Sequence, residues 1–85
     1  MGYYLLLSRS ITQAQRMSTA LIKAGLRAGY GRAPMTLSDR GCGYAVRVEA
    51  GKLPAALEEL RRLGLMPSRI FLAREDGVYK ELPLP

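Results

Sequence analysis

The stretch that decides the fold is LIKAGL at residues 21–26, because it returns in outline as LRRLGL at residues 60–65. Each copy ends a run of apolar residues at helical spacing with a glycine followed by a leucine. Glycine just after such a run is a common stop signal for a helix. Each copy also lies between two segments of strand character. The repeat therefore predicts two halves built on the same plan of strand, helix and strand.

The first half begins with an apolar run typical of a central strand and ends with a weaker strand that contains two glycines. Ser10 is a favourable N-cap for the helix between them, Gln13 stands at the capping-box position, and Gly25 follows as the stop. The glycines lower the strand propensity of the last segment, which favours a place at the edge of the sheet. The predicted elements are a strand at 2–7, a helix at 11–24 and a strand at 26–33.

The second half starts with a strand in which Tyr44 shares one face with Val46 and Val48. A helix with an apolar stripe follows, and Glu58 stands four residues before Arg62, in the favourable order for an ion pair. Asp76-Gly77 is a strong signal for a two-residue hairpin, so the chain is expected to fold back once more. The predicted elements are strands at 43–49, 68–74 and 78–82 and a helix at 53–63.

Two βαβ halves in one short chain predict an α+β fold of the ferredoxin-like βαββαβ type. In that arrangement the sheet is antiparallel, both helices pack on one face, and strands 2–7 and 43–49 lie side by side in the centre. The segment 78–82 would add an extra strand through the C-terminal hairpin. A length of 85 residues predicts a single domain over residues 1–85, with an irregular tail at 83–85.

The composition restricts the function classes. Thirteen lysines and arginines against seven acidic residues give a net charge of +6, which suits an anionic partner or simply an arginine-rich solvated surface. One cysteine and no histidine exclude a thiolate–imidazole metal site within one chain, and no cofactor is expected. We find no apolar run long enough to cross a membrane and no signal peptide. A reduced, cytoplasmic protein with a free thiol is the simplest interpretation.

Cys42 is the residue with the clearest chemical potential, because it stands between two glycines in a polar loop. The predicted topology brings it beside the N-terminus of the first helix, where the helix dipole and nearby arginines would lower the pKa of the thiol. A small buried hydrophobe is the alternative interpretation of a lone cysteine. The residues predicted to support a reactive Cys42 are Arg9, Ser10, Thr12, Ser38, Arg40, Gly41 and Gly43.

A further pattern extends along most of the chain: YLLL at 4–7, Ser10 with Ala14, Pro34, Leu37-Ser38, and Cys42-Gly43 ahead of an alternating strand. This order resembles the selenium/sulfur carrier-like family of small bacterial proteins, from about Tyr3 to Phe71. The resemblance implies that Cys42 holds sulfur or selenium as a persulfide or selenosulfide. It also implies donor and acceptor proteins as partners. A chain without histidine for general-base work suits a carrier better than a turnover enzyme.

Two other functions remain open from the residues. The first is a ligand-sensing or dimerisation module, in which the weak second strand or the C-terminal hairpin pairs edge to edge in a homodimer. The second is RNA binding, which the fold and charge allow but which is less favoured. Strand 43–49 carries one aromatic residue, Tyr44, and its face is shared with apolar core positions rather than with a stacking platform.

Overall fold

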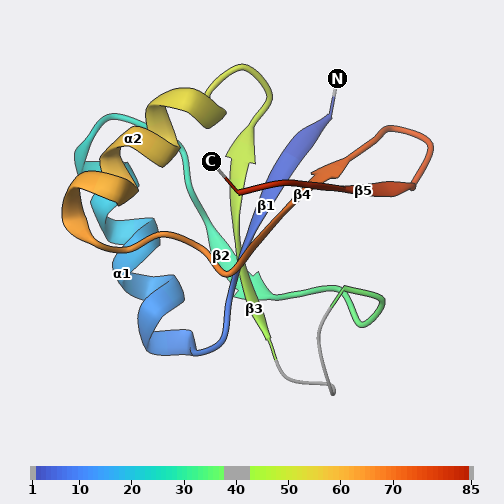
Figure 1. Cartoon of the computed structure of the whole chain (residues 1–85), viewed down its shortest axis with the longest axis horizontal. Helices are drawn as coiled ribbons and strands as arrows, with labels where there is room; N and C mark the ends of the chain where they lie inside the picture. Colours follow the sequence, from blue (N-terminus) through green and yellow to red (C-terminus); the bar gives the residue numbers. More distant parts are fainter. Residues whose placement is uncertain (1, 38–42, 85) are drawn as a thin grey trace.

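The computed structural model describes residues 2–37 and 43–84, and it contains the predicted elements in the predicted order (Figure 1). The added C-terminal strand is present as well. The elements are β1 (Tyr3–Ser8), α1 (Ile11–Lys23), β2 (Tyr30–Arg32), β3 (Tyr44–Glu49), α2 (Leu53–Leu63), β4 (Arg69–Ala73) and β5 (Tyr79–Leu82).

The five strands form one antiparallel sheet in the order β2-β3-β1-β4-β5. Both helices lie on the same side of it in Figure 1. Removing β5 leaves the strand order of a ferredoxin-like βαββαβ fold, so the predicted α+β class is confirmed. β1 lies between β3 and β4, and β2 forms one edge of the sheet, as predicted.

The repeated glycine–leucine pair has one structural explanation in both halves. After α1, Leu26 N–H donates to Leu21 C=O (2.9 Å) and Gly25 N–H donates to Ile22 C=O (3.0 Å). The end of α2 repeats this pattern: the N–H of the leucine after Gly64 reaches back to Leu60 C=O (2.8 Å). These are Schellman motifs, in which a residue with positive φ satisfies the last carbonyls of a helix. Gly25 and Gly64 have φ values of +87° and +71°.

The second strand is shorter than predicted: β2 spans Tyr30–Arg32, and its hydrogen bonds to the neighbouring chain extend only to Gly29 and Ala33 on either side. The beginning of the predicted strand is used for other contacts. Leu26 closes the Schellman motif, and the carbonyl of buried Ala28 accepts a hydrogen bond from Ser18 on α1. The chain therefore leaves the helix, packs against it, and joins the sheet only at Gly29, whose carbonyl accepts a hydrogen bond from Arg47 N–H.

On α2, Arg62 pairs with Glu59, where the sequence predicted Glu58. Positions three and four residues apart are both neighbours on a helix surface, so spacing alone does not choose between them. The pair is on the exposed side of α2, so it contributes little to the free energy of unfolding.

Each face of the sheet buries a group of apolar side chains. The larger group fills the space between sheet and helices: Leu6, Ala14, Met17, Leu21, Ala28, Val46, Val48, Ala56, Leu57, Leu60 and Ile70. The smaller group lies on the face away from the helices: Leu5, Leu7, Ala33, Leu37, Ala45 and Phe71. Neighbouring residues of β1, such as Leu5 and Leu6, therefore point into different cores.

Within the described ranges, neither helix has the length and apolar character that a membrane-crossing segment needs.

Candidate functional site

The candidate site is at the end of the sheet where β1 stops and β3 starts. Ser8, the last residue of β1, is the Cα partner of Tyr44, the first residue of β3. Gly43 precedes Tyr44, and its carbonyl accepts a hydrogen bond from Ala33 N–H at 3.1 Å. Gly43, which follows Cys42 in the sequence, is thus held at the end of the sheet where the chain also turns into α1. The predicted topology has the same arrangement.

Four of the predicted site residues, Ser38, Arg40, Gly41 and Cys42, lie outside the described residues. Their roles, including the acidity of the Cys42 thiol, remain predictions. The other four are described: Gly43 at the start of β3, and Arg9, Ser10 and Thr12 at the turn into α1.

Ser10 is the N-cap of α1, as its position predicted. Its Oγ accepts a hydrogen bond from Gln13 N–H (3.1 Å), and its carbonyl accepts one from Ala14 N–H (3.1 Å). Across the described part of the chain, the N–H groups of Ile11 and Thr12 have no protein acceptor. The first turn also contains no acidic residue. The positive end of the α1 dipole is therefore available to an anion and is not neutralised by its own first turn.

Ser8 contributes to this end of the sheet in a way that the sequence analysis missed. It is 2% exposed, and its Oγ lies 3.0 Å from Ser10 C=O and 3.2 Å from Gln13 Oε1. Gln13 does not complete the predicted capping box, because its side-chain amide donates to Met66 C=O at 3.2 Å. Since Met66 is distant in the sequence, local spacing favoured the capping box, and only the packing of the chain before β4 could reveal this contact. The only sequence signal for this role of Ser8 was its position as a polar residue at the end of an apolar strand.

Ser10→Ala is expected to lower the free energy of unfolding by about 1 kcal/mol, because it removes the N-cap acceptor of Gln13 N–H. Ser10→Asp should retain most of the stability, since a carboxylate caps the same N–H and interacts favourably with the helix dipole. Urea unfolding of both variants measures the difference. Equal losses in the alanine and aspartate variants would contradict the capping role.

The loop after β2 brings the chain onto the face of the sheet away from the helices. Leu37, the last described residue before position 38, is buried there with Ala33 and Leu7. The two described residues that flank the segment 38–42 are thus both held by tertiary contacts, Leu37 by apolar packing and Gly43 by the hydrogen bond to Ala33.

Two arginines cover aromatic rings on this same face. The guanidinium of Arg47 lies 3.8 Å from the ring centre of Tyr3, and that of Arg69 lies 4.8 Å from the ring centre of Phe71. Guanidinium groups stack favourably on aromatic rings, and their aliphatic stems cover apolar surface. Tyr44, the aromatic residue of β3, packs instead against the core beneath the helices. These rings are therefore already engaged and do not form a free stacking platform.

Two ionisable groups at the β5 edge have shifted pKa values. The pKa of Glu81 is lowered, first by its hydrogen bond to Arg69, whose Nε and Nη2 lie 2.9 and 2.8 Å from the carboxylate oxygens. The pKa of Tyr79 is raised by burial and by the neighbouring phenol of Tyr3. Both groups tie β5 to β4 and β1 and lie at the edge of the sheet opposite β2.

Comparison with known proteins identifies the family. Residues 3–72 match the family described as "Putative Se/S carrier protein-like". The chain belongs to the Se/S carrier-like family. The match runs from the first residue of β1 to Leu72 in β4 and leaves out β5, in agreement with the resemblance found from the sequence. No curated protein and no solved structure matches the chain.

Among residues 2–37 and 43–84, no group of three or more histidine, cysteine, aspartate or glutamate side chains is placed to hold a metal ion.

Proposed function

We propose that this protein carries a sulfur or selenium atom on Cys42, as a persulfide or selenosulfide, between a donor and an acceptor protein. The observation that carries the proposal is the family match, which spans residues 3–72 and so includes the single cysteine of the chain. A carrier of this chemistry needs one nucleophilic thiol, and Cys42 is the only residue that can supply it. A reducing, cytoplasmic setting would keep that thiol free between transfers.

The transfer step is a displacement at sulfur that needs no external oxidant or reductant. The Cys42 thiolate attacks the outer sulfur of a donor persulfide, the new S–S bond forms, and the old S–S bond breaks. The donor leaves as a thiolate, and the outer atom remains on Cys42 with its proton or as an anion. A donor that carries selenium as its outer atom reacts in the same way. The acceptor protein then removes the atom by the reverse displacement.

The described part of the site supports an anion at this end of the sheet. The first turn of α1 offers the N–H groups of Ile11 and Thr12 and contains no carboxylate. Gly43 is held at the same end of the sheet, next to the end of β1. A thiolate or persulfide anion near this turn would be stabilised by the helix dipole, which is the usual way in which proteins make a cysteine acidic.

Intact mass spectrometry tests the proposal directly. The purified, reduced chain is incubated with a low-molecular-weight persulfide, separated from it, and weighed under native conditions. We expect the mass to increase by one sulfur atom, and the increase to disappear on treatment with dithiothreitol. Cys42→Ser is the control, and it should gain nothing.

The rate of alkylation of Cys42 by iodoacetamide as a function of pH supplies the second measurement. We expect the thiol pKa to lie below the value of about 8.5 that is usual for a free cysteine. A pKa at or above that value, together with no sulfur gained from the persulfide, would overturn the carrier function.

A further inference from the structure

The outer edge of β2 presents backbone groups that have no partner among residues 2–37 and 43–84. In the antiparallel ladder with β3, Gly31 faces Ala45, and the neighbouring bonds run from Arg47 N–H to Gly29 C=O (2.8 Å) and from Ala33 N–H to Gly43 C=O. Because the bonding direction alternates along an antiparallel strand, the N–H and C=O groups of Tyr30 and Arg32 point away from β3. All three residues of β2 are exposed, so this edge is open to an added strand.

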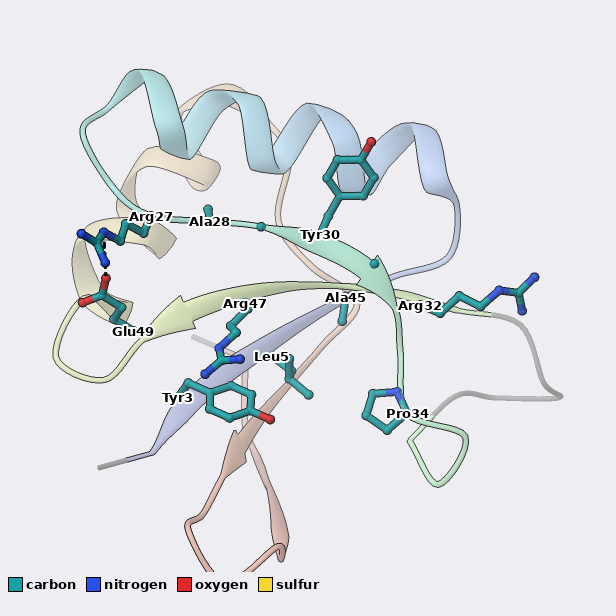
Figure 2. A pocket seen from close by; sticks show the side chains of 12 residues that line it. Tyr3, Leu5, Arg27, Ala28, Tyr30, Arg32, Pro34, Ala45, Arg47 and Glu49 are labelled. Carbon is teal, nitrogen blue, oxygen red and sulfur yellow. Dashed lines mark ion pairs between the residues drawn. The ribbon is translucent and has the colours of Figure 1, made fainter.

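A groove lies directly under this edge, on the face of the sheet away from the helices (Figure 2). It has a volume of about 630 Å³. Figure 2 shows β2 along one side, with Tyr3, Leu5 and Pro34 toward the bottom of the groove and Arg47 lying over the ring of Tyr3. A side chain built on Gly31 would meet no atom within 4 Å, so nothing in the described part of the chain blocks the approach at this point. A strand added to β2 would place every second side chain over this groove.

The charges around the edge select the partner. Arg27 stands at one end of the groove and Arg47 within it, against the single carboxylate of Glu49 among the lining residues (Figure 2). Arg32 stands at the other end, and its guanidinium lies on the helix-facing side of the sheet, 6.0 Å from the ring centre of Tyr44. Glu49 lies 3.8 Å from Arg27, and both side chains are exposed to solvent. The net positive charge along a free backbone edge therefore favours an extended segment that is rich in aspartate or glutamate.

The positive charge of the chain and the covered aromatic rings disfavour two other binding partners at this edge. A second copy of the chain would bring another net charge of +6 and another pair of β2 arginines to the same edge. Single-stranded nucleic acid binds largely by stacking bases on open aromatic faces, and on the groove side Arg47 and Arg69 cover the rings of Tyr3 and Phe71.

We propose that the β2 edge and the groove beneath it dock an acidic, extended segment of a partner protein by strand addition. The segment pairs with the outward N–H and C=O groups of Tyr30 and Arg32. Its acidic side chains on the groove side meet Arg27 and Arg47, and those on the opposite side meet Arg32. This docking goes beyond the proposed carrier function, because it uses the edge of the sheet and requires no reaction at Cys42.

The test uses a short, end-blocked peptide of repeated Thr-Thr-Asp-Asp units, which places aspartates on both faces of an added strand, with the lysine-for-aspartate peptide as control. Binding is followed by amide NMR shifts of the full-length chain at two salt concentrations. We expect the largest shifts, and slowed amide hydrogen exchange, at Tyr30 and Arg32. The affinity should fall as salt is raised, and the lysine peptide should not bind.

Paired charge variants separate the edge from general electrostatic attraction. Arg32→Gln should weaken binding roughly two- to fivefold, and Arg61→Gln on α2 should leave it unchanged, although both remove one exposed positive charge. Glu49→Gln should tighten binding by a similar factor, because it removes the carboxylate beside the groove, whereas Glu58→Gln on α2 should not. Arg32→Pro should weaken binding more than Arg32→Gln, since proline also removes the outward N–H and leaves the ladder to β3 intact.

Four results would overturn the proposal: shifts centred away from β2, equal binding of the lysine peptide, equal weakening by Arg32→Gln and Arg61→Gln, or displacement of the peptide by a mixed-sequence RNA. Dilution-dependent shifts at Tyr30 and Arg32 without peptide would assign the edge to a second copy and would also overturn it. Cys42→Ser should bind the peptide normally, so failure of the carrier chemistry and failure of docking are distinguishable.

Discussion

Leu6→Ala is expected to lower the free energy of unfolding by about 2–5 kcal/mol, because it leaves a cavity in the main core that its neighbours cannot fill. Leu6 is fully buried at the centre of β1, the central strand of the sheet. Its Cα partners are Val46 on β3 and Ile70 on β4, and both side chains belong to the same core. Leu6 is packed between both neighbouring strands and beneath the helices, so the surrounding side chains cannot move far enough to fill the cavity.

This loss is large relative to the whole, since a domain of this length has a total stability of roughly 4–13 kcal/mol. Urea unfolding followed by circular dichroism measures the change as a lower transition midpoint. Ile22→Ala is the matched control, because Ile22 is a similar side chain on α1 that is 57% exposed. A loss below about 1 kcal/mol for Leu6→Ala would show that the core is less closely packed than the structure indicates.

Phe71→Ala is expected to lower the free energy of unfolding by about 3–5 kcal/mol, although Phe71 lies on the face of the sheet away from α1 and α2. The side chain is only 5% exposed. It contacts the smaller core with Leu5, its Cα partner on β1, and Arg69 covers its ring. Arg69 is held in turn by Glu81 on β5. Truncation therefore removes a large apolar contact and the surface on which the guanidinium rests.

Val78→Ala serves as the control for Phe71, because Val78 is 51% exposed in the turn before β5. Its loss should stay within about 0.5 kcal/mol. Thermal unfolding of the two variants gives the comparison. If Phe71→Ala behaved like Val78→Ala, the smaller group of buried residues would be ordinary surface rather than a second core.

Much of the fold could be predicted from short-range signals. The two Schellman motifs depend on residues within six positions of one another, so the glycine–leucine repeat was enough to place both helix ends. The cap at Ser10 and the hairpin after β4 are local for the same reason, and the structure contains both. The predicted two-residue turn is wrong in detail: Arg74 N–H donates to Val78 C=O (2.9 Å) and Gly77 N–H donates to Arg74 C=O (3.1 Å), so the loop is residues 75–77 and Gly77 ends it at a φ of +85°. The order of the elements then left few topologies, and the ferredoxin-like order is the one observed.

The differences occur where a choice depends on distant residues. Gln13 contacts Met66 rather than the backbone of its own cap. The beginning of the predicted second strand is held by Ser18 on α1 and does not enter the sheet. In both cases the local sequence predicted one hydrogen-bond partner. When the helices packed on the sheet, a residue from another part of the chain became the partner instead.

The features of the candidate site also divide into those that the sequence predicted and those that only the tertiary structure shows. The lone cysteine, the glycines beside it and the family could be identified from the sequence, and the family match confirms the last of these. The structure adds that the N-terminus of α1, with Arg9, Ser10 and Thr12, lies at the same end of the sheet as Gly43 at the start of β3. The acidity and reactivity of Cys42 remain predictions.

The sequence by itself determined the helices, the strands and their order, because caps, turns and periodicity act over a few residues. Only the tertiary structure decided that Arg47 and Arg69 cover the face away from the helices. It also decided that the described part of the chain leaves the outer edge of β2 open above a basic groove. Both features follow from the register of strands that are far apart in the chain. That register places Arg47 beside Leu5, Phe71 on the other side of Leu5, and Gly31 opposite Ala45 at the edge.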